Sequence, residues 1–202
     1  MKHRKTILII CVVILIFFII IIYKFLKSGN NISNKSADEI KNYILNIESY
    51  YAIAKVTIKS NKNENTYLVK QEYNKKNNYY MQEVLEPEKI RGVQFIFDGK
   101  DLKLENTKLT LSKIYKDYKY LDSNELSLVS FIDDYKDSEA SQFKEVDGEI
   151  VLETKVTIGN KYIASKKLYF NKAENKVEKI EIKDNTQNTR IYVCYQEIQL
   201  NK

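Results

Sequence analysis

VQFIFDGKDLKL, at residues 93–104, carries the pattern from which the fold can be predicted. Large apolar side chains occupy every second position on both sides of an Asp-Gly pair: Val93, Phe95 and Phe97 precede it, and Leu102 and Leu104 follow it. Alternation with a period of two is typical of a β-strand that buries one face. Asp-Gly between two such runs is a strong hairpin signal. Residues 93–104 therefore predict an antiparallel hairpin.

The same period of two continues on both sides of this hairpin. Strands are expected over residues 52–59, 67–73 and 79–84, and a strand carrying Leu109 and Leu111 is expected after a turn at Glu105-Asn106. Further along, Asp147-Gly148 and Gly159-Asn160 predict two more hairpin turns. The remaining strands are expected at 150–158, 162–170, 177–183 and 191–200. The sequence thus predicts nine to eleven antiparallel strands.

Two other segments have helical spacing. Ser36 and Glu39 form a capping box, and apolar residues follow at helical intervals to about Glu48. A second helix is expected over residues 126–135, with Ser123 or Asn124 as its N-cap. We therefore expect a mainly β (α+β) domain in which two helices cover an antiparallel sheet.

A hydrophobic run near the start of the chain predicts a membrane anchor. Residues from Ile7 to Ile22 are all apolar apart from Cys11, and with the residues up to Leu26 a helix would span about 30 Å. The cations before the run place the N-terminus in the cytoplasm: Lys2, Arg4 and Lys5. A cleaved signal peptide and a lipoprotein signal at Cys11 are the two alternatives.

The expected organisation follows from this anchor. Residues 1–27 are a cytoplasmic tail and a single transmembrane span, residues 28–35 a polar linker, and residues 36–202 one extracytoplasmic domain. The expected location is the cell membrane. Removing the five cations of residues 1–27 leaves 28 basic residues against 27 acidic ones, so the domain is nearly neutral. Nucleic-acid binding is therefore not expected.

The exported part offers few groups for catalysis. The only histidine is His3, before the anchor, and the domain contains a single cysteine, Cys194. We therefore expect no enzyme activity, no metal site and no cofactor. Two carboxylate pairs, Asp133-Asp134 and Glu86 with Glu88, are expected on solvated surfaces. Lys113 to Tyr120 interleaves cations with aromatic residues and is expected to be an exposed strand or loop.

The region around the central hairpin resembles a known family. P-x-x-x-x-G from Pro87 to Gly92, then Asp-Gly-Lys at 98–100, and then Leu104, Asn106, Leu109 and Ser112 are similar to clostridial spore-germination lipoproteins of the GerS family. The order of helices and strands resembles the LolA/LolB lipoprotein-carrier fold. That fold implies a strongly curved sheet, an open half-barrel whose concave face is closed by helices. Cys11 lacks a proper lipobox, which indicates a membrane-anchored relative.

The resemblance implies a binding protein that supports a cortex-modifying amidase in spore formation or germination and has no catalysis of its own. It also implies that the membrane could be a forespore membrane. The alternative is a carrier of lipid or lipoprotein acyl chains that uses the apolar concavity. For partner binding the candidate residues are Pro87, Arg91 and Gly92. For the apolar concave face they are Phe95, Phe97, Leu102 and Leu104.

Overall fold

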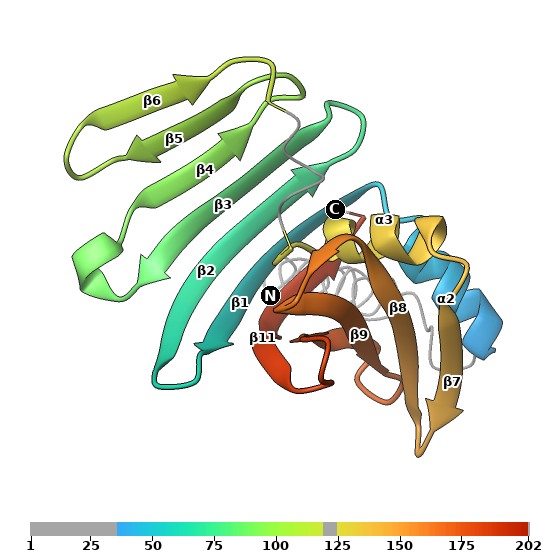
Figure 1. Ribbon diagram of the computed structural model, residues 1–202. Helices are drawn as coiled ribbons and strands as arrows, with labels where there is room; N and C mark the ends of the chain where they lie inside the picture. Colours follow the sequence, from blue (N-terminus) through green and yellow to red (C-terminus); the bar gives the residue numbers. More distant parts are fainter. Residues whose placement is uncertain (1–35, 119–124, 202) are drawn as a thin grey trace, which may run out of the picture. The chain divides into compact units, whose positions relative to one another are not determined.

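Eleven strands form one sheet in the computed structural model, which describes residues 36–118 and 125–201 (Figure 1). The strands are β1 (Ser49–Lys59), β2 (Glu64–Asn74), β3 (Tyr79–Glu86), β4 (Val93–Phe97), β5 (Leu102–Asn106), β6 (Leu111–Tyr115), β7 (Gln142–Val146), β8 (Glu149–Asn160), β9 (Ile163–Asn171), β10 (Lys176–Lys183) and β11 (Thr189–Leu200). Their order across the sheet is β6-β5-β4-β3-β2-β1-β11-β10-β9-β8-β7. The first and last strands of the chain, β1 and β11, therefore pair in the middle.

The predicted central hairpin is confirmed. β4 and β5 are antiparallel, with Phe97 opposite Leu102 and Phe95 opposite Leu104, so these four side chains share one face of the sheet. Gly99 lies in the turn with a φ of +96°, a conformation that favours glycine.

Two predicted turns were wrong. β5 continues to Asn106, so the chain turns at residues 107–110 and not at Glu105-Asn106. Gly159 and Asn160 lie inside β8, and the turn falls on Lys161 and Tyr162. A bulge in the β8–β9 pairing shifts the register just before this turn, so the strand runs past the residues that were expected to reverse the chain.

Two α-helices accompany the sheet within the described residues: α2 (Ala37–Leu45) and α3 (Leu128–Asp137). The predicted capping box of α2 is present, with the Ser36 side chain accepting from the Glu39 N–H. α2 ends at Leu45, before the expected end at Glu48. The N-cap of α3 is Ser127, whereas the predicted caps Ser123 and Asn124 lie outside the described residues.

The core lies between the helices and the β7–β11 end of the sheet, which bends toward them in Figure 1. The helices contribute fully buried side chains, Ile40, Ile44, Leu128 and Phe131, and so do the strands: Ile150, Leu152, Leu168, Phe170, Ile180, Ile182 and Val193. Burying one such side chain contributes about 1.5–3 kcal/mol. Burial of these side chains therefore stabilises the packing of the helices on this end of the sheet.

A charged cluster also joins α3 to the sheet. The Lys166 side chain on β9 is fully buried, and its Nζ lies 2.7 Å from Asp134 Oδ2 and 2.5 Å from Glu125 Oε2. It also donates to Ser130 Oγ at 2.7 Å. The expectation that Asp134 is solvated was therefore wrong, because this residue faces the sheet and neutralises a buried lysine. Its neighbour Asp133 is exposed, as expected.

The predicted anchor, including Ile7, Cys11 and Ile22, lies outside the described residues, as does the linker. Among the helices that the structure does describe, each is too short or too polar to cross a membrane.

Candidate functional site

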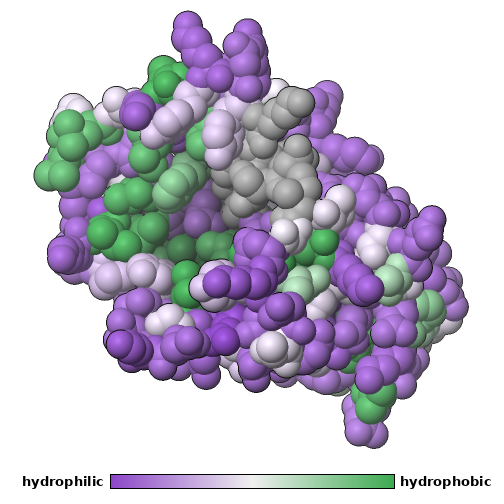
Figure 2. Space-filling view, in the orientation of Figure 1, coloured by the Kyte–Doolittle hydropathy of each residue, from purple (hydrophilic) through white to green (hydrophobic). Residues whose placement is uncertain are grey.

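Exposed apolar side chains gather at the β6 end of the sheet. In the described residues, the exposed fractions there are 63% for Leu109, 61% for Leu111, 56% for Ile114 and 38% for Tyr115. Figure 2 shows hydrophobic side chains gathering over this end of the sheet. We call these four residues the β6 surface. Large apolar side chains that remain in water together mark an interaction site more often than isolated ones do.

The strand register shows which face most of this surface occupies. Leu111 and Tyr115 lie opposite Asn106 and Leu102, so they share a face with the β4–β5 residues Phe95, Phe97, Leu102 and Leu104. Phe97 and Leu102 are buried, and Phe95 and Leu104 are half-buried. Together these side chains make an apolar strip that ends at β6, and Ile114 lies on the opposite face.

The same face carries the helices further along the sheet. Phe95 lies opposite Gln82 on β3, and Gln82 opposite Gln71 on β2. The buried Gln71 side chain donates to Gln82 Oε1 at 3.1 Å and to the backbone oxygen of Leu126 at 3.2 Å, just before α3. The helix-bearing face is thus continuous with the apolar strip, as the sequence-based assignment of these side chains to the concave face assumed.

β6 is the terminal strand of the described sheet, and the sequence segment that contains it is basic. Residues 106–116 contain three lysines and no carboxylate. Lys108 pairs with Glu88, whereas Lys113 lies over the Tyr115 ring at 4.7 Å from its centroid. The surface therefore combines apolar side chains, positive charge and the backbone of an edge strand.

The turn that contains Pro87, Arg91 and Gly92 lies beside this surface. Arg91 Nε donates to the Leu85 oxygen at 2.8 Å, and its guanidinium pairs with Glu88 Oε2 at 2.8 Å. The hydrogen bond from Lys108 is the main reason that the pKa of Glu88 lies below its ordinary value. Arg91 thus helps to hold the turn, although 48% of its side chain is exposed.

Gly92 braces the same turn against the β5–β6 turn. Its φ is +83°, and its oxygen accepts from the Thr107 N–H at 3.1 Å and from Thr107 Oγ1 at 3.2 Å. A Cβ at this position would lie 2.5 Å from Thr107 Oγ1. The structure thus places Pro87, Arg91 and Gly92 together next to the β6 surface, where they have a structural role.

The four residues of the β6 surface were not among the site residues predicted from the sequence. Leu109 and Leu111 were predicted only to lie in a strand. Ile114 and Tyr115 lie in the segment from Lys113 to Tyr120, which was predicted to be an exposed strand or loop without a binding role. The signal that could have found them is a segment, residues 106–116, that contains apolar and basic residues but no acidic one.

The second candidate site is a pocket beside three hairpin turns. A pocket of about 570 Å³ is bordered by residues of the β1–β2 turn, by Tyr162 of the β8–β9 turn and by Arg190 of β11. Its apolar lining comes from Ile58, Ile163 and Ile191, and Lys59 and Lys62 add positive charge. Its volume is within the range of small-molecule sites.

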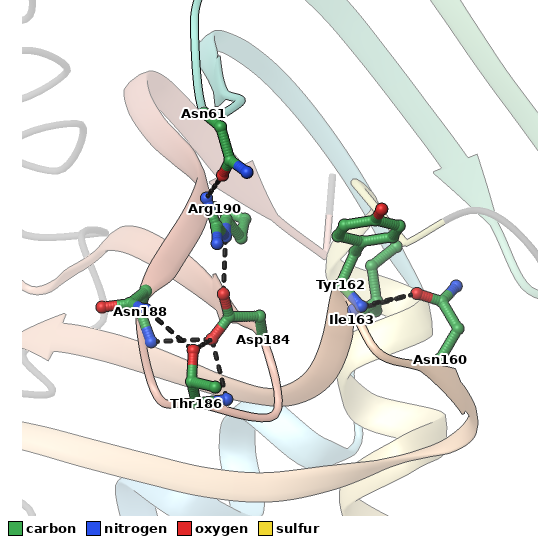
Figure 3. A network of polar contacts seen from close by, with 8 residues as sticks. All are labelled: Asn61, Asn160, Tyr162, Ile163, Asp184, Thr186, Asn188 and Arg190. Atoms are coloured by element: carbon green, nitrogen blue, oxygen red, sulfur yellow. Dashed lines mark hydrogen bonds and ion pairs between the residues drawn. The ribbon is translucent and has the colours of Figure 1, made fainter.

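Figure 3 shows the polar network that fixes Arg190 at this pocket. Arg190 donates to Asp184 Oδ2 at 2.6 Å and to Asn61 Oδ1 at 3.0 Å. Asp184 Oδ1 also accepts from the Thr186 hydroxyl at 2.7 Å and from the backbone N–H groups of Thr186 and Asn188. Burial alone would raise the pKa of Asp184, but these hydrogen bonds outweigh it and hold the pKa well below its ordinary value.

The described residues hold no group of three or more His, Cys, Asp or Glu side chains arranged for a metal ion. Lys166 with its two carboxylates is a buried structural cluster that helps to hold α3 on the sheet. The features considered as candidate sites are the apolar strip, the basic edge strand and the pocket at the hairpin turns.

The fold defines the class of protein: a mainly β domain in which α-helices lie on one face of a single antiparallel sheet. A model of the family described as sporulation protein YdcC-like matches residues 4–202, and the chain belongs to this family. None of the curated proteins compared with the chain matches it.

Several solved structures are similar. In the complex of the CwlD amidase with the GerS lipoprotein from Clostridioides difficile, the matched chain is 26% identical, with a TM-score of 0.51 over 79% of this chain and 91% of that one. An uncharacterized conserved protein from Thermus thermophilus is 11% identical, with a TM-score of 0.50, and the match covers 82% and 88% of the two chains. A LolA superfamily protein from Nitrosomonas europaea is 14% identical, with a TM-score of 0.43 and coverage of 83% and 94%.

Proposed function

We propose that this protein is a non-catalytic, membrane-anchored binding protein of the GerS type. In this proposal the extracytoplasmic domain supports a cortex-modifying amidase in spore formation or germination. The observation that carries it is the β6 surface, four large apolar side chains held in water on a domain similar to a lipoprotein that was solved in complex with an amidase. Membership of a sporulation family supports the same setting.

The proposed contact region is the β6 surface with the neighbouring turn. Interfaces concentrate their binding energy in a few aromatic, large apolar and arginine side chains. Tyr115 and Leu111 supply the apolar part, and Arg91 lies on the adjacent turn. The predicted span from Ile7 to Ile22 would hold this region outside the cytoplasm, where cell-wall enzymes act.

A carrier of lipid or lipoprotein acyl chains remains the second candidate function. The pocket at the hairpin turns favours it, because isoleucine side chains line the hollow and lysines stand beside it. An anionic amphiphile would match that combination. An uncleaved anchor would keep such a carrier at one membrane, which favours the binding protein.

The test measures binding of the full chain, purified in detergent, to the cortex-modifying amidase of the same cell. We expect a stable complex that the double variant Leu111→Ser, Tyr115→Ser weakens at least tenfold. Arg91→Ala should weaken it less and leave the domain folded. Val146→Ser is the matched control, because Val146 is also exposed (45%) but lies on β7, at the other edge of the sheet.

Deleting the gene should leave vegetative growth normal and impair spores at a cell-wall step. Normal cortex chemistry and normal germination in the deletion strain would refute the proposal. Transfer of acyl chains between vesicles by the purified chain, without amidase binding, would favour the carrier.

A further inference from the structure

The two edges of the described sheet differ in chemistry. β7, at one edge, carries charges of both signs in Lys144 and Glu145, and Glu145 is paired with Lys172. β6, at the other edge, carries Lys113 and exposed apolar residues but no acidic residue. An edge strand has one row of backbone N–H and C=O groups that no strand of its own sheet satisfies. β7 carries one large exposed apolar side chain, Val146, whereas β6 carries three beside its unsatisfied backbone groups: Leu111, Ile114 and Tyr115.

We propose that β6 binds an extended segment of the partner protein as an additional antiparallel strand. This inference rests on the proposed function, since the partner is the amidase. Strand addition obtains affinity from main-chain hydrogen bonds and specificity from alternate side chains. The antiparallel direction follows the described sheet, in which every pair of neighbouring strands is antiparallel.

The side chains of β6 define the sequence that such a segment must carry. Directly opposite residues in antiparallel strands interact, and opposite charges there are favourable. Apolar side chains are therefore expected opposite Leu111, Ile114 and Tyr115, and a carboxylate opposite Lys113. A second carboxylate is expected opposite Lys116, which follows the strand. Read from its own N-terminus, the segment is acidic, apolar, apolar, acidic, polar, apolar.

Charge also decides between an acidic segment and a second copy of this chain. Two β6 strands paired antiparallel about their central residue would place Lys113 opposite Lys113. Like charges directly opposite each other destabilise the pair. Lys113 and Lys116 have no carboxylate within ion-pair distance in the part of the chain that the structure describes, so an acidic partner segment would supply the missing counter-charge.

The first test uses proline at neighbouring positions of β6. Backbone N–H groups along an edge strand point alternately toward its neighbour and away, so Ser112→Pro and Lys113→Pro remove one group of each kind. We expect one variant to lose stability. The other should keep its thermal midpoint within a few degrees of the wild type and bind the amidase at least tenfold more weakly.

Charge reversal provides the second test. Lys113→Glu should weaken amidase binding at least tenfold, and Lys144→Glu on β7 should leave it within twofold. If the wild-type chain binds the amidase and Lys113→Glu and both proline variants bind it equally well, strand addition at β6 is refuted but the proposed function stands. If the wild type does not bind the amidase, the proposed function fails.

A peptide tests the inference independently of the amidase. The acetylated and amidated peptide Glu-Leu-Val-Glu-Thr-Leu should bind the full chain at least tenfold more tightly than Lys-Leu-Val-Lys-Thr-Leu. Equal binding of the two peptides would overturn the proposed charge pattern. A dimer of the chain that Ser112→Pro or Lys113→Pro disperses, with amidase binding unchanged, would assign the edge to a second copy.

Discussion

Large apolar side chains are buried at one end of the sheet and exposed at the other. At the β7–β11 end, α2 and α3 cover the apolar side chains, and Ile150, Leu152 and Leu168 have no exposed surface. At the β6 end, Leu109 in the β5–β6 turn and Leu111 on β6 remain more than half exposed. The sheet itself therefore does not require these residues to be exposed, because the same chain covers residues of this kind elsewhere. An apolar surface that stays in water is a reason to look for a partner.

The largest effect is expected where the helices are tied down. Lys166→Met removes a buried cation and leaves Asp134 and Glu125 without their counter-charge, which should cost about 3–5 kcal/mol of unfolding free energy. Equilibrium unfolding in urea measures it. The matched control is Lys167→Met, whose partner Glu153 is partly in solvent, and it should cost less than about 1 kcal/mol. Equal losses in the two variants would show that the cluster does not hold the covered end.

An intermediate effect is expected at the uncovered end. Gly92→Ala must adopt a φ of +83° and also place its Cβ 2.5 Å from Thr107 Oγ1, so we expect a loss of about 2 kcal/mol. Gly148→Ala shares the positive φ, +82°, but meets no atom within 4 Å, and should lose about 1 kcal/mol. The difference between the unfolding free energies of the two variants in urea measures the effect of the contact with Thr107. A Gly92→Ala variant as stable as Gly148→Ala would argue against a brace between the two turns.

The smallest effect concerns pH and the hairpin-turn pocket. The folded-state pKa of Asp184 lies below its ordinary value of 3.8, so its ionised form stabilises the fold above that pH, and this stabilisation is lost as the pH falls through the lowered pKa. The stability difference between wild type and Asp184→Asn should therefore be constant above about pH 5 and shrink below about pH 4. Thermal unfolding across this range measures it, with Asp147→Asn, in an exposed turn, as control. A difference that grew on acidification would contradict the network in Figure 3.

Local patterns in the sequence predicted most of the strands, the N-cap of α2 and the central hairpin. Asp98-Gly99 and the capping box at Ser36 depend on residues within a few positions, so their chemistry can be read directly. The burial of Asp134 could not be read in this way, because its partner Lys166 comes from a strand 32 positions later. The turn after β5 was misplaced for a related reason. Glu105 and Asn106 are polar residues typical of turns, yet their pairing with β6 keeps them in a strand.

The site was predicted only in part. Phe95, Phe97, Leu102 and Leu104 were placed on one face, and the register puts them there together. Leu111, which lies on the same face, was predicted to be in a strand but was not predicted to be exposed. Exposure depends on which strand ends the sheet and on where the helices lie, and neither is encoded in a local pattern.

The pairing of β1 with β11 has a consequence for the order in which the domain can form. β1 and β2 are neighbours in sequence and can pair as soon as both are synthesised, whereas Tyr50 pairs with Leu200 only after nearly the whole domain exists. Asn201 completes this junction, since its side chain accepts from the Glu48 N–H at 2.8 Å. Long-range pairing of this kind slows folding, because a long loop must close before the contact forms. Until β11 is synthesised, β1 is therefore an open edge strand. Its unpaired backbone groups could pair with another chain, whereas in the finished protein β11 covers them.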